Sequence, residues 1–501
     1  MRLSSENRNF FRLVNESVAS NPFSSERIEL DRKIVGGNTS MAGEALVDMV
    51  IGMVLERLSQ LRGEFKVDLA AYSDEDRYLL QQVQMFEVYY RFTDDFDLLI
   101  KKQSKSGDHP CKVQFARDAI SQLCHCGCNE TEALRYFAFF YQLRRTFYFI
   151  HHNLIGQSHS IQTLRCQLWN AVFTTDIRRY ERFLWNRMED FSTLILGETG
   201  TGKGTAAAAI GRSGFIPFDA QRGVFAESFT RNFIGINLSQ FPETLIESEL
   251  FGHKKGAFTG AIEEHPGLLA LCTPHGSVFL DEIGDASVPV QIKLLEVLQE
   301  RTFSPLGSRD RKRFSGRVIA ATNKPLQELG LQGEFREDFF YRLCSNVITM
   351  PTLRQRLQED SGELDLLLQA IVQKTLGENV PEIGKDIRSV LKRDLPANYL
   401  WPGNVRELEQ AVRRIILCDT YPGNIFTSPG RNNLSNQLFQ GMADNSLSAA
   451  RLIEGYCLLV YQRHGTYEEV ARRTGLDRRT VKKYIRMAES WGAEDPGSVV
   501  P

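Results

Sequence analysis

Three things are scarce in this 501-residue sequence: cysteine, an excess of one charge, and long hydrophobic runs. Nine cysteines are too few for a disulfide-stapled scaffold, and those that stand alone among apolar residues are expected to be reduced. The 60 Lys+Arg and 62 Asp+Glu residues leave a formal charge of -2, so any nucleic-acid contact must come from a local basic patch. With 42% hydrophobic residues the chain is globular, and its length predicts two to four domains.

The most apolar run extends only from Ala45 to Leu55 and contains Asp48, whereas a membrane helix needs about 20 apolar residues. The sequence also begins without the apolar core and small-residue cleavage site of a secretory signal. Together these observations predict a cytoplasmic protein.

The first 152 residues are predicted to be mostly helical. Apolar residues recur three and four positions apart in residues 43–61, 74–102 and 131–150, whereas the polar stretch 21–40 is predicted to be a loop. The region has neither a nucleotide fingerprint nor the strand-and-acid pattern of a receiver domain. We therefore treat it as a regulatory or sensory region of unknown type.

One segment of this region concentrates thiols and imidazoles: Cys124, His125, Cys126 and Cys128, with His109 and Cys111 upstream. Such groups can hold zinc or an iron–sulfur cluster, which would make the region a metal or redox sensor. Structural zinc sites, however, usually separate paired cysteines by about two to four residues. We prefer reduced thiols at the end of a helix that Gly127 and Asn129 terminate, and keep the metal site as the alternative.

From about Leu154 short β-branched strands alternate with helices, which predicts an α/β domain with a parallel sheet. A buried strand is predicted at 192–196 and an alanine-rich helix at 205–210. Glycines between them let backbone N–H groups turn toward phosphates, and Lys203 adds a positive charge. The predicted phosphate-binding loop comprises Gly197, Glu198, Thr199, Gly200, Thr201, Gly202, Lys203, Gly204 and Thr205.

Two further predicted strands end in polar residues. Residues 276–280 lead into Asp281 and Glu282, and residues 317–322 lead into Asn323. One carboxylate of such a pair can hold magnesium while the other polarises the attacking water. In this order and spacing, the strands predict ATP binding and hydrolysis better than they predict unrelated core strands with polar ends.

A loop with a glycine-flanked Phe–Thr pair lies before the predicted strand at 276–280. Residues 249–261 contain the uninterrupted sequence GAFTGA and resemble the loop of the NtrC-type sigma-54 activators, the bacterial enhancer-binding AAA+ ATPases. The resemblance covers roughly residues 154–420. It implies a ring, expected to be a hexamer, that uses ATP to push this loop against sigma-54 and to remodel the closed RNA polymerase complex. The implied sigma-54 contacts are Gly256, Ala257, Phe258, Thr259, Gly260 and Ala261.

The same resemblance implies roles for single residues. Lys203 and the loop glycines would bind phosphate, Asp281 would hold Mg²⁺ and Glu282 would activate water. Where the family usually has glutamate after the lysine, this chain has Gly204, which leaves the nucleotide affinity open. The other implied residues are Asn237, which holds Glu282; Asn323, the first sensor; Arg336 and Arg342, which reach a neighbouring subunit's nucleotide; and Arg406, the second sensor.

A charged segment, residues 176–183, precedes the phosphate-loop strand and departs from the family pattern. It is predicted to be an extra helix at a subunit edge or, preferably, a solvated face.

The last motif is basic. Residues 466–486 hold seven basic and three acidic residues and predict a helix–turn–helix similar to the Fis-like module of these activators. Val470 and Ala471 give the first helix an apolar face, Gly475 permits the turn, and Asp477 caps the second helix. The predicted DNA contacts are Arg478, Arg479, Thr480, Lys482 and Lys483.

The predicted order is a helical region (1–152), an α/β AAA+ core (153–350), its helical lid (351–425), a linker (426–445) and a helix–turn–helix module (446–490). The chain is thus predicted to be a DNA-bound, sigma-54-dependent activator with ATP and Mg²⁺ as cofactors. The alternatives are a P-loop remodelling ATPase or helicase loader without a promoter role, and a DNA-binding factor with an inactive ATPase.

Overall fold

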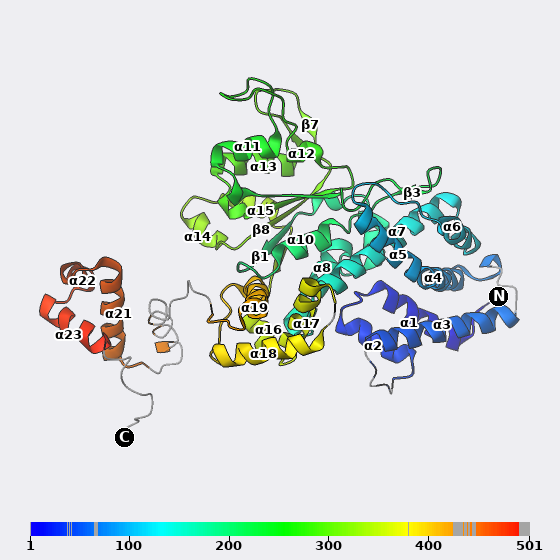
Figure 1. Ribbon diagram of the computed structural model, residues 1–501. Helices are drawn as coiled ribbons and strands as arrows, with labels where there is room; N and C mark the ends of the chain where they lie inside the picture. The colour runs from blue at the N-terminus through cyan, green and yellow to red at the C-terminus, as the bar shows by residue number, and fades with distance from the viewer. Residues whose placement is uncertain are drawn as a thin grey trace. The chain divides into compact units, whose positions relative to one another are not determined.

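The computed structural model describes residues 2–37, 43–64, 69–378, 380–423 and 447–489, and the single positions 39, 41, 434, 438, 441 and 442. The chain divides into two compact units (Figure 1). The first comprises residues 1–389 and 398–417, and the second comprises 390–397 and 418–501. The predicted linker at 426–445 lies outside the described residues except at 434, 438, 441 and 442. None of the described helices is long and apolar enough to cross a membrane.

The N-terminal region is helical, as predicted. The periodic segments form helices, but the segment 74–102 is two helices that break at Phe92. The elements are α1 (Ser5–Ala19), α2 (Ser25–Ile34), α3 (Glu44–Glu64), η1 (Leu69–Ala71), α4 (Asp74–Arg91), α5 (Thr93–Ser106), α6 (Ala116–His125) and α7 (Glu130–Asn153).

The prediction of a loop over residues 21–40 is wrong, because α2 occupies its middle. Ser24 caps this helix by accepting a hydrogen bond from the backbone N–H of Arg27. The buried side of α2 carries an ion pair between Arg27 and Asp31, whose Nε and Oδ2 atoms lie 2.9 Å apart. A helix that buries charges in place of an apolar stripe gives no hydrophobic periodicity to detect.

Two hydrophobic cores divide the N-terminal region. Helices α1 to α4 enclose one core around Phe11, Val54 and Leu80. The other side of α4, together with α5, α6 and α7, belongs to a core that continues into the α/β domain. Helix α7 packs against α10 (Lys203–Gly211), the helix that follows the phosphate loop. The small side chains of α10 leave room for the aromatic residues of α7.

The α/β domain is built on a five-stranded parallel sheet in the order β4-β5-β8-β1-β9, which confirms the predicted parallel-sheet architecture of this domain. Its strands are β4 (Phe233–Asn237), β5 (Ser277–Asp281), β8 (Arg317–Thr322), β1 (Thr193–Leu196) and β9 (Asn346–Thr349). Alternate residues enter different cores: Ile195 and Ile319 face α10 and the N-terminal helices, whereas Leu194 and Val318 face α11, α13 and α15. Both faces are therefore covered, as parallel sheets require.

The other elements of this domain are α8 (His159–Phe173), α9 (Ile177–Arg179), η2 (Tyr180–Leu184), η3 (Met188–Asp190), β2 (Phe218–Asp219), β3 (Val224–Phe225), η4 (Leu238–Gln240), α11 (Glu243–Phe251), α12 (Leu268–Leu271), η5 (Ile283–Asp285), α13 (Val288–Glu300), β6 (Thr302–Phe303), β7 (Lys312–Arg313), α14 (Leu326–Leu331) and α15 (Glu337–Leu343).

The charged segment 176–183 forms short helical turns with one buried anchor. The ring of Tyr180 is fully buried and stacks on Phe139, and its hydroxyl donates to Gln142 Oε1 at 3.0 Å. Arg182 and Phe183 face solvent. The segment is thus solvated over most of its surface but fastened at Tyr180 to α7 of the N-terminal region.

The helices α16 (Leu353–Glu359), α17 (Glu363–Leu376), α18 (Pro381–Asp394) and α19 (Asn404–Cys418) come after the last strand of the sheet. A buried ion pair joins α16 to α17, with Arg356 NH2 and Glu363 Oε1 2.6 Å apart. The Glu363 carboxylate also accepts from the backbone N–H groups of Gln157 and Ser158, which precede α8. The lid helices are therefore tied to the start of the α/β domain.

The second unit contains α21 (Ala449–His464), α22 (Tyr467–Thr474) and α23 (Arg478–Glu489). Val470, Val481 and Ile485 share a small core with α21. Gly475 has a φ of 72°, the left-handed conformation that ends α22. Asp477 Oδ1 accepts from the backbone N–H groups of residues 479 and 480, as expected of a cap.

Candidate nucleotide-binding site

The phosphate loop connects β1, an inner strand of the sheet, to a helix N-terminus. It runs from β1 to α10, with Gly200 at φ 81° and Gly202 at φ 97°. A side chain at Gly200 would also collide with the lid, because its Cβ would lie 2.1 Å from the carbonyl oxygen of Gly403. Lys203 Nζ is buried and donates to the carbonyl oxygen of Gly197 at 3.0 Å. Gly204 has open space around it.

The two carboxylates lie beside this lysine at the carboxyl edge of the sheet. Asp281 is the last residue of β5, and Glu282 follows it with a φ of 54°, which turns its side chain away from the strand direction. Glu282 Oε1 lies 3.9 Å from Lys203 Nζ. Lysine and both acids, far apart in sequence, therefore meet at one point, as their strand-end positions predict.

Asn237 has a different partner from the expected one. Its Nδ2 donates to Asp281 Oδ2 at 3.3 Å, whereas the resemblance implied a contact with Glu282. The register explains the difference, since Asn237 pairs with Asp281 across the parallel strands β4 and β5. The left-handed backbone at Glu282 directs its side chain toward β8, the neighbour of β5 on the other side.

That neighbour is β8, which ends at Asn323. The backbone N–H of Asn323 donates to Glu282 Oε2 at 3.2 Å, and its Nδ2 donates to Thr199 Oγ1 of the phosphate loop at 2.8 Å. Asn323 therefore joins the carboxylate pair to the phosphate loop, a position from which it can respond to bound nucleotide.

The lid reaches the same loop. The backbone N–H of Arg406 donates to the carbonyl oxygen of Gly200 at 3.3 Å, and its side chain is exposed. Two lid residues that sequence reasoning missed, Arg354 and Asn404, hydrogen-bond to Glu198. Asn404 stands two positions before Arg406, so its motif was a usable signal. Arg354 gave none, because only the fold brings it to Glu198.

Arg336 and Arg342 bind groups of their own chain at and near α15. Arg336 pairs with Asp338 at 2.7 Å, and hydrogen bonding to that carboxylate raises the pKa of Arg336. Arg342 donates to the carbonyl oxygen of Leu298 through Nε at 3.1 Å. Neither contact involves the phosphate loop of the same chain.

The GAFTGA segment forms a glycine-hinged loop between α11 and α12, beyond the sheet in Figure 1. Gly256 and Gly260 have φ of 80° and 100°, and the backbone N–H of Gly256 donates to the carbonyl oxygen of Ala261 at 2.8 Å. Phe258 is 38% exposed, and its ring lies edge-on to His253 at 4.9 Å. The loop presents an aromatic side chain on a closed turn.

A second loop supports it. The backbone N–H of Lys254 donates to the carbonyl oxygen of Leu306, and that of Leu306 donates to the carbonyl oxygen of Gly252. Leu306 lies in the connection between β6 and β7. The base of the GAFTGA loop is thus held at two points by backbone hydrogen bonds.

The cysteine segment lies elsewhere. Helix α6 ends at His125, and Gly127 has a φ of 87°, whereas Asn129 caps the next helix, α7, instead of ending α6. Burial raises the pKa of Cys126 to about 12 and that of Cys128 to about 11. No cluster of three or more metal-ligating side chains occurs among the described residues.

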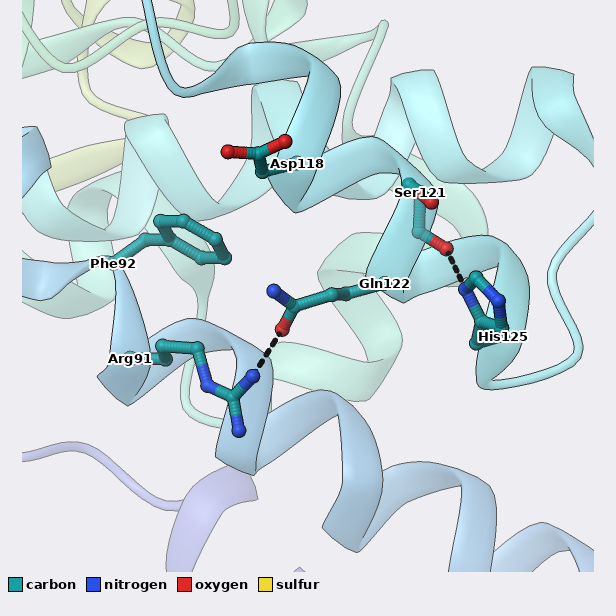
Figure 2. A pocket seen from close by; sticks show the side chains of 6 residues that line it. All are labelled: Arg91, Phe92, Asp118, Ser121, Gln122 and His125. Carbon is teal, nitrogen blue, oxygen red and sulfur yellow. Dashed lines mark hydrogen bonds between the residues drawn. The ribbon is translucent and has the colours of Figure 1, made fainter.

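Figure 2 shows a shallow pocket of about 330 Å³ beside this helix. The ring nitrogen Nδ1 of His125 contacts the carbonyl oxygen of Ser121 at 2.6 Å, and Arg91 donates to Gln122 Oε1 at 3.0 Å. The imidazole is therefore engaged with its own helix. The pocket is lined by Arg91, Phe92, Asp118, Ser121, Gln122 and His125.

The basic helix α23 is amphipathic. Val481 and Ile485 are buried, whereas Arg478, Arg479, Lys482 and Lys483 are exposed. The hydroxyl of Thr480 donates to Asp477, so this residue supports the cap and is only partly exposed.

Taken together, the parallel sheet, the phosphate loop after its β1 strand, the acid pair after β5 and the helical lid define an α/β domain of the AAA+ class. Residues 175–349 match the family model described as the sigma-54 interaction domain. This part of the chain is therefore similar to a sigma-54 interaction domain.

Curated relatives match over somewhat less than half of the chain. The DNA-binding transcriptional regulator NtrC of Azospirillum brasilense is 40% identical over 228 residues, 45% of this chain and 43% of that protein. The Nif-specific regulatory protein of Klebsiella pneumoniae is 40% identical over 225 residues, 45% and 39% of the two chains. The chain thus spans less than half the length of these relatives. The solved structure of NtrX from Brucella abortus in complex with ATP is 18% identical, with a TM-score of 0.40, and covers 74% of this chain and 80% of that chain.

Proposed function

We propose that this chain is a sigma-54-dependent transcriptional activator that binds DNA and uses ATP hydrolysis in an oligomeric ring to remodel the closed complex of sigma-54 RNA polymerase. One observation carries the proposal: a single domain holds both the Lys203–Asp281–Glu282 edge and an exposed GAFTGA loop. Its target would place the protein in the cytoplasm.

The proposed chemistry uses groups already at the sheet edge. The amides of the phosphate loop and Lys203 bind the phosphates of ATP. The carboxylate of Asp281 fits a magnesium ion, because within the described part of the chain it accepts only from Asn237 Nδ2 and the N–H of Glu282 and keeps further lone pairs. Magnesium, when bound, would neutralise charge on the phosphates. Glu282, oriented by Lys203 and Asn323, withdraws the proton from the attacking water.

Arg336 and Arg342 are proposed to act across a subunit boundary. Within one chain they contact Asp338 and a carbonyl oxygen, so their proposed work on nucleotide needs a neighbouring subunit in the ring. A cation supplied in trans stabilises the negative charge that spreads over the phosphoryl group. On the basis of the family resemblance, the ring is proposed to be a hexamer. Arg406 is proposed to be the residue through which the lid contacts phosphate.

The remaining parts are assigned as predicted. Residues 1–152 are proposed to regulate, 153–350 to form the ATPase core and 351–425 the lid, with a linker at 426–445. The helices at 446–490 are proposed to be a helix–turn–helix whose second helix, α23, lies in the major groove. Its exposed contacts are Arg478, Arg479, Lys482 and Lys483, and Thr480 joins them.

The test combines the purified protein with sigma-54 holoenzyme and a supercoiled sigma-54 promoter. Addition of ATP, but not of a non-hydrolysable analogue, is expected to produce open complexes, which permanganate reactivity of unpaired thymines detects. The assay is run at protein concentrations high enough for non-specific binding to the promoter DNA. ATP hydrolysis without promoter opening under these conditions would favour a remodelling ATPase or helicase loader.

A further inference from the structure

The lid approaches the phosphate loop through one acidic side chain. Glu198, the second residue of the loop, receives two hydrogen bonds from Arg354, at 2.9 and 2.5 Å. Asn404 Nδ2 adds a third, to Oε2, at 3.1 Å. These donors, the arginine first, lower the pKa of Glu198. The Glu198 carboxylate is therefore charged and accepts hydrogen bonds from the lid. The backbone amides of the loop and Lys203 are left to bind phosphate.

Asn404 connects three segments at once. It is completely buried and has a φ of 50°, a left-handed conformation that asparagine tolerates better than most residues. Its Oδ1 accepts from the backbone N–H of Leu353 at 2.8 Å, and its Nδ2 also donates to the carbonyl oxygen of Thr199 at 3.1 Å. The starts of α16 and α19 are thereby fixed to the phosphate loop.

The same loop residue leads to the catalytic edge. Thr199 Oγ1 accepts from Asn323 Nδ2, and the backbone N–H of Asn323 donates to Glu282. A continuous series of hydrogen bonds thus joins the lid, the phosphate loop and the carboxylate proposed to activate water. A change in the lid position alters the support of Glu282 along this series.

We propose that Glu198, Arg354 and Asn404 form a clasp of positioning residues that sets the lid against the phosphate loop for hydrolysis. This inference rests on the proposed ATPase function. The side chains of Arg354 and Glu198 are 38% and 42% exposed, so the pair adds little to stability. Its effect is geometric: it fixes the angle at which α16 and α19 meet the loop.

The test is the kinetics of Arg354→Lys and Glu198→Gln in the full chain. Lysine keeps the charge but loses the two-pronged geometry, and glutamine keeps the shape but loses the charge. Each variant is expected to lower kcat for ATP by about tenfold to 100-fold, the cost of small misplacement. The dissociation constant of fluorescent ADP should change by less than about threefold, because the phosphate-binding groups are intact.

A matched control lies within the lid. Arg388 pairs with Asp365 with similar exposure, 35% and 50%, and does not belong to the clasp. Arg388→Lys is expected to leave kcat and ADP affinity at the parental values. The double variant of Glu198→Gln with Arg354→Lys should lose no more activity than the worse single variant, because both substitutions remove the same interaction.

Parental kcat in Arg354→Lys and Glu198→Gln would overturn the clasp. So would additive losses in the double variant, or a weaker ADP affinity with unchanged kcat, which would make the pair a binding contact. Absence of ATP hydrolysis by the parent protein would instead contradict the proposed function, so the two failures are distinguishable.

Discussion

At the scale of single residues, Glu282 is the group proposed to activate the attacking water. Its backbone is left-handed, and its carboxylate lies between Lys203 Nζ and the backbone N–H of Asn323. Glu282→Gln keeps the shape and one acceptor oxygen but cannot take a proton. We expect nucleotide binding near the parental value and kcat at least about 100-fold lower, the usual size of a general-base contribution.

Steady-state ATPase assays and titration with fluorescent ADP measure the two quantities. Asp281→Asn serves as the comparison and should damage both, because this carboxylate is the proposed magnesium ligand. Hydrolysis at the parental rate by Glu282→Gln would assign water activation to another group.

The cysteines provide a second prediction at this scale. Burial raises the pKa of Cys126 and Cys128 to about 12 and 11, so both are neutral thiols at pH 8, whereas Cys124 is exposed. Thiolates are the reactive form, so iodoacetamide should alkylate the exposed Cys124 before Cys126 and Cys128. Mass spectrometry of the labelled peptides checks the order. Stoichiometric zinc or iron lost from a Cys124/Cys126/Cys128 triple serine variant would restore the metal interpretation.

The sequence predicted those site residues that stand next to one another or at strand ends. Lys203, Asp281, Glu282 and Asn323 meet because strand ends share one edge of a parallel sheet. The hydrogen bond of Asn237 to Asp281 was not predicted, since strand register decides it and the sequence does not show register. Arg354 was missed for a similar reason, as its contact with Glu198 exists only after the lid has folded back.

At the scale of elements, ATP hydrolysis should not depend on the tip of the GAFTGA loop. Thr259 lies between Phe258 and the hinge at Gly260, far in sequence from the groups that meet at Lys203. Thr259→Ala removes a hydroxyl and a methyl group from the loop tip without touching the hinges. We expect parental ATPase activity together with the loss of sigma-54 binding and promoter opening.

Co-sedimentation with sigma-54 and open-complex formation are the measurements for Thr259→Ala. Thr302→Ala, in the short strand β6 of the supporting hairpin, is the comparison for a threonine near but outside the loop. Sigma-54-dependent transcription by Thr259→Ala at the parental level would remove the main support for the proposed function.

Element prediction succeeded where apolar periodicity was clear and failed where charge was buried. Helices α3 and α7 match their predicted segments to within a few residues. Helix α2 was missed because Arg27 and Asp31 satisfy each other inside the protein. The break at Phe92 was also missed, since the apolar period continues across it and only the packing of α4 and α5 reveals two helices.

At the scale of the whole molecule, ATP hydrolysis and DNA binding are proposed to belong to different parts of the chain. Deletion of residues 446–501 removes α21, α22 and α23, whose small core is formed mainly by these helices. The shortened protein should hydrolyse ATP at the parental rate and lose high-affinity DNA binding. Fluorescence anisotropy measures the DNA affinity at several salt concentrations. The affinity of the shortened protein should depend less steeply on salt, because fewer phosphates are neutralised. Tight, sequence-selective binding by the shortened protein would place the DNA contacts elsewhere.

The N-terminal region, by contrast, is joined to the ATPase domain by its core. Arg145 of α7 is completely buried and donates to the carbonyl oxygens of Arg212 and Gly214, where α10 ends. Burial lowers its pKa to about 10, so it stays charged at neutral pH and faces the negative end of that helix. The boundary predicted at residue 152 therefore cuts through a continuous core that the sequence could not show.

Arg145→Met tests whether this region and the ATPase core unfold together. Methionine keeps much of the apolar stem but leaves two buried carbonyl oxygens without a charged donor, which should cost about 2–4 kcal/mol. The thermal transition lowered by Arg145→Met should be the one that added ADP raises, since ADP stabilises only the folded ATPase core. Arg12→Met, which breaks an exposed pair with Glu75, should leave the transition unchanged. Calorimetry with and without ADP decides the matter: if Arg145→Met lowers a separate transition that ADP does not shift, the N-terminal helices fold as an independent domain and the shared core has no energetic consequence.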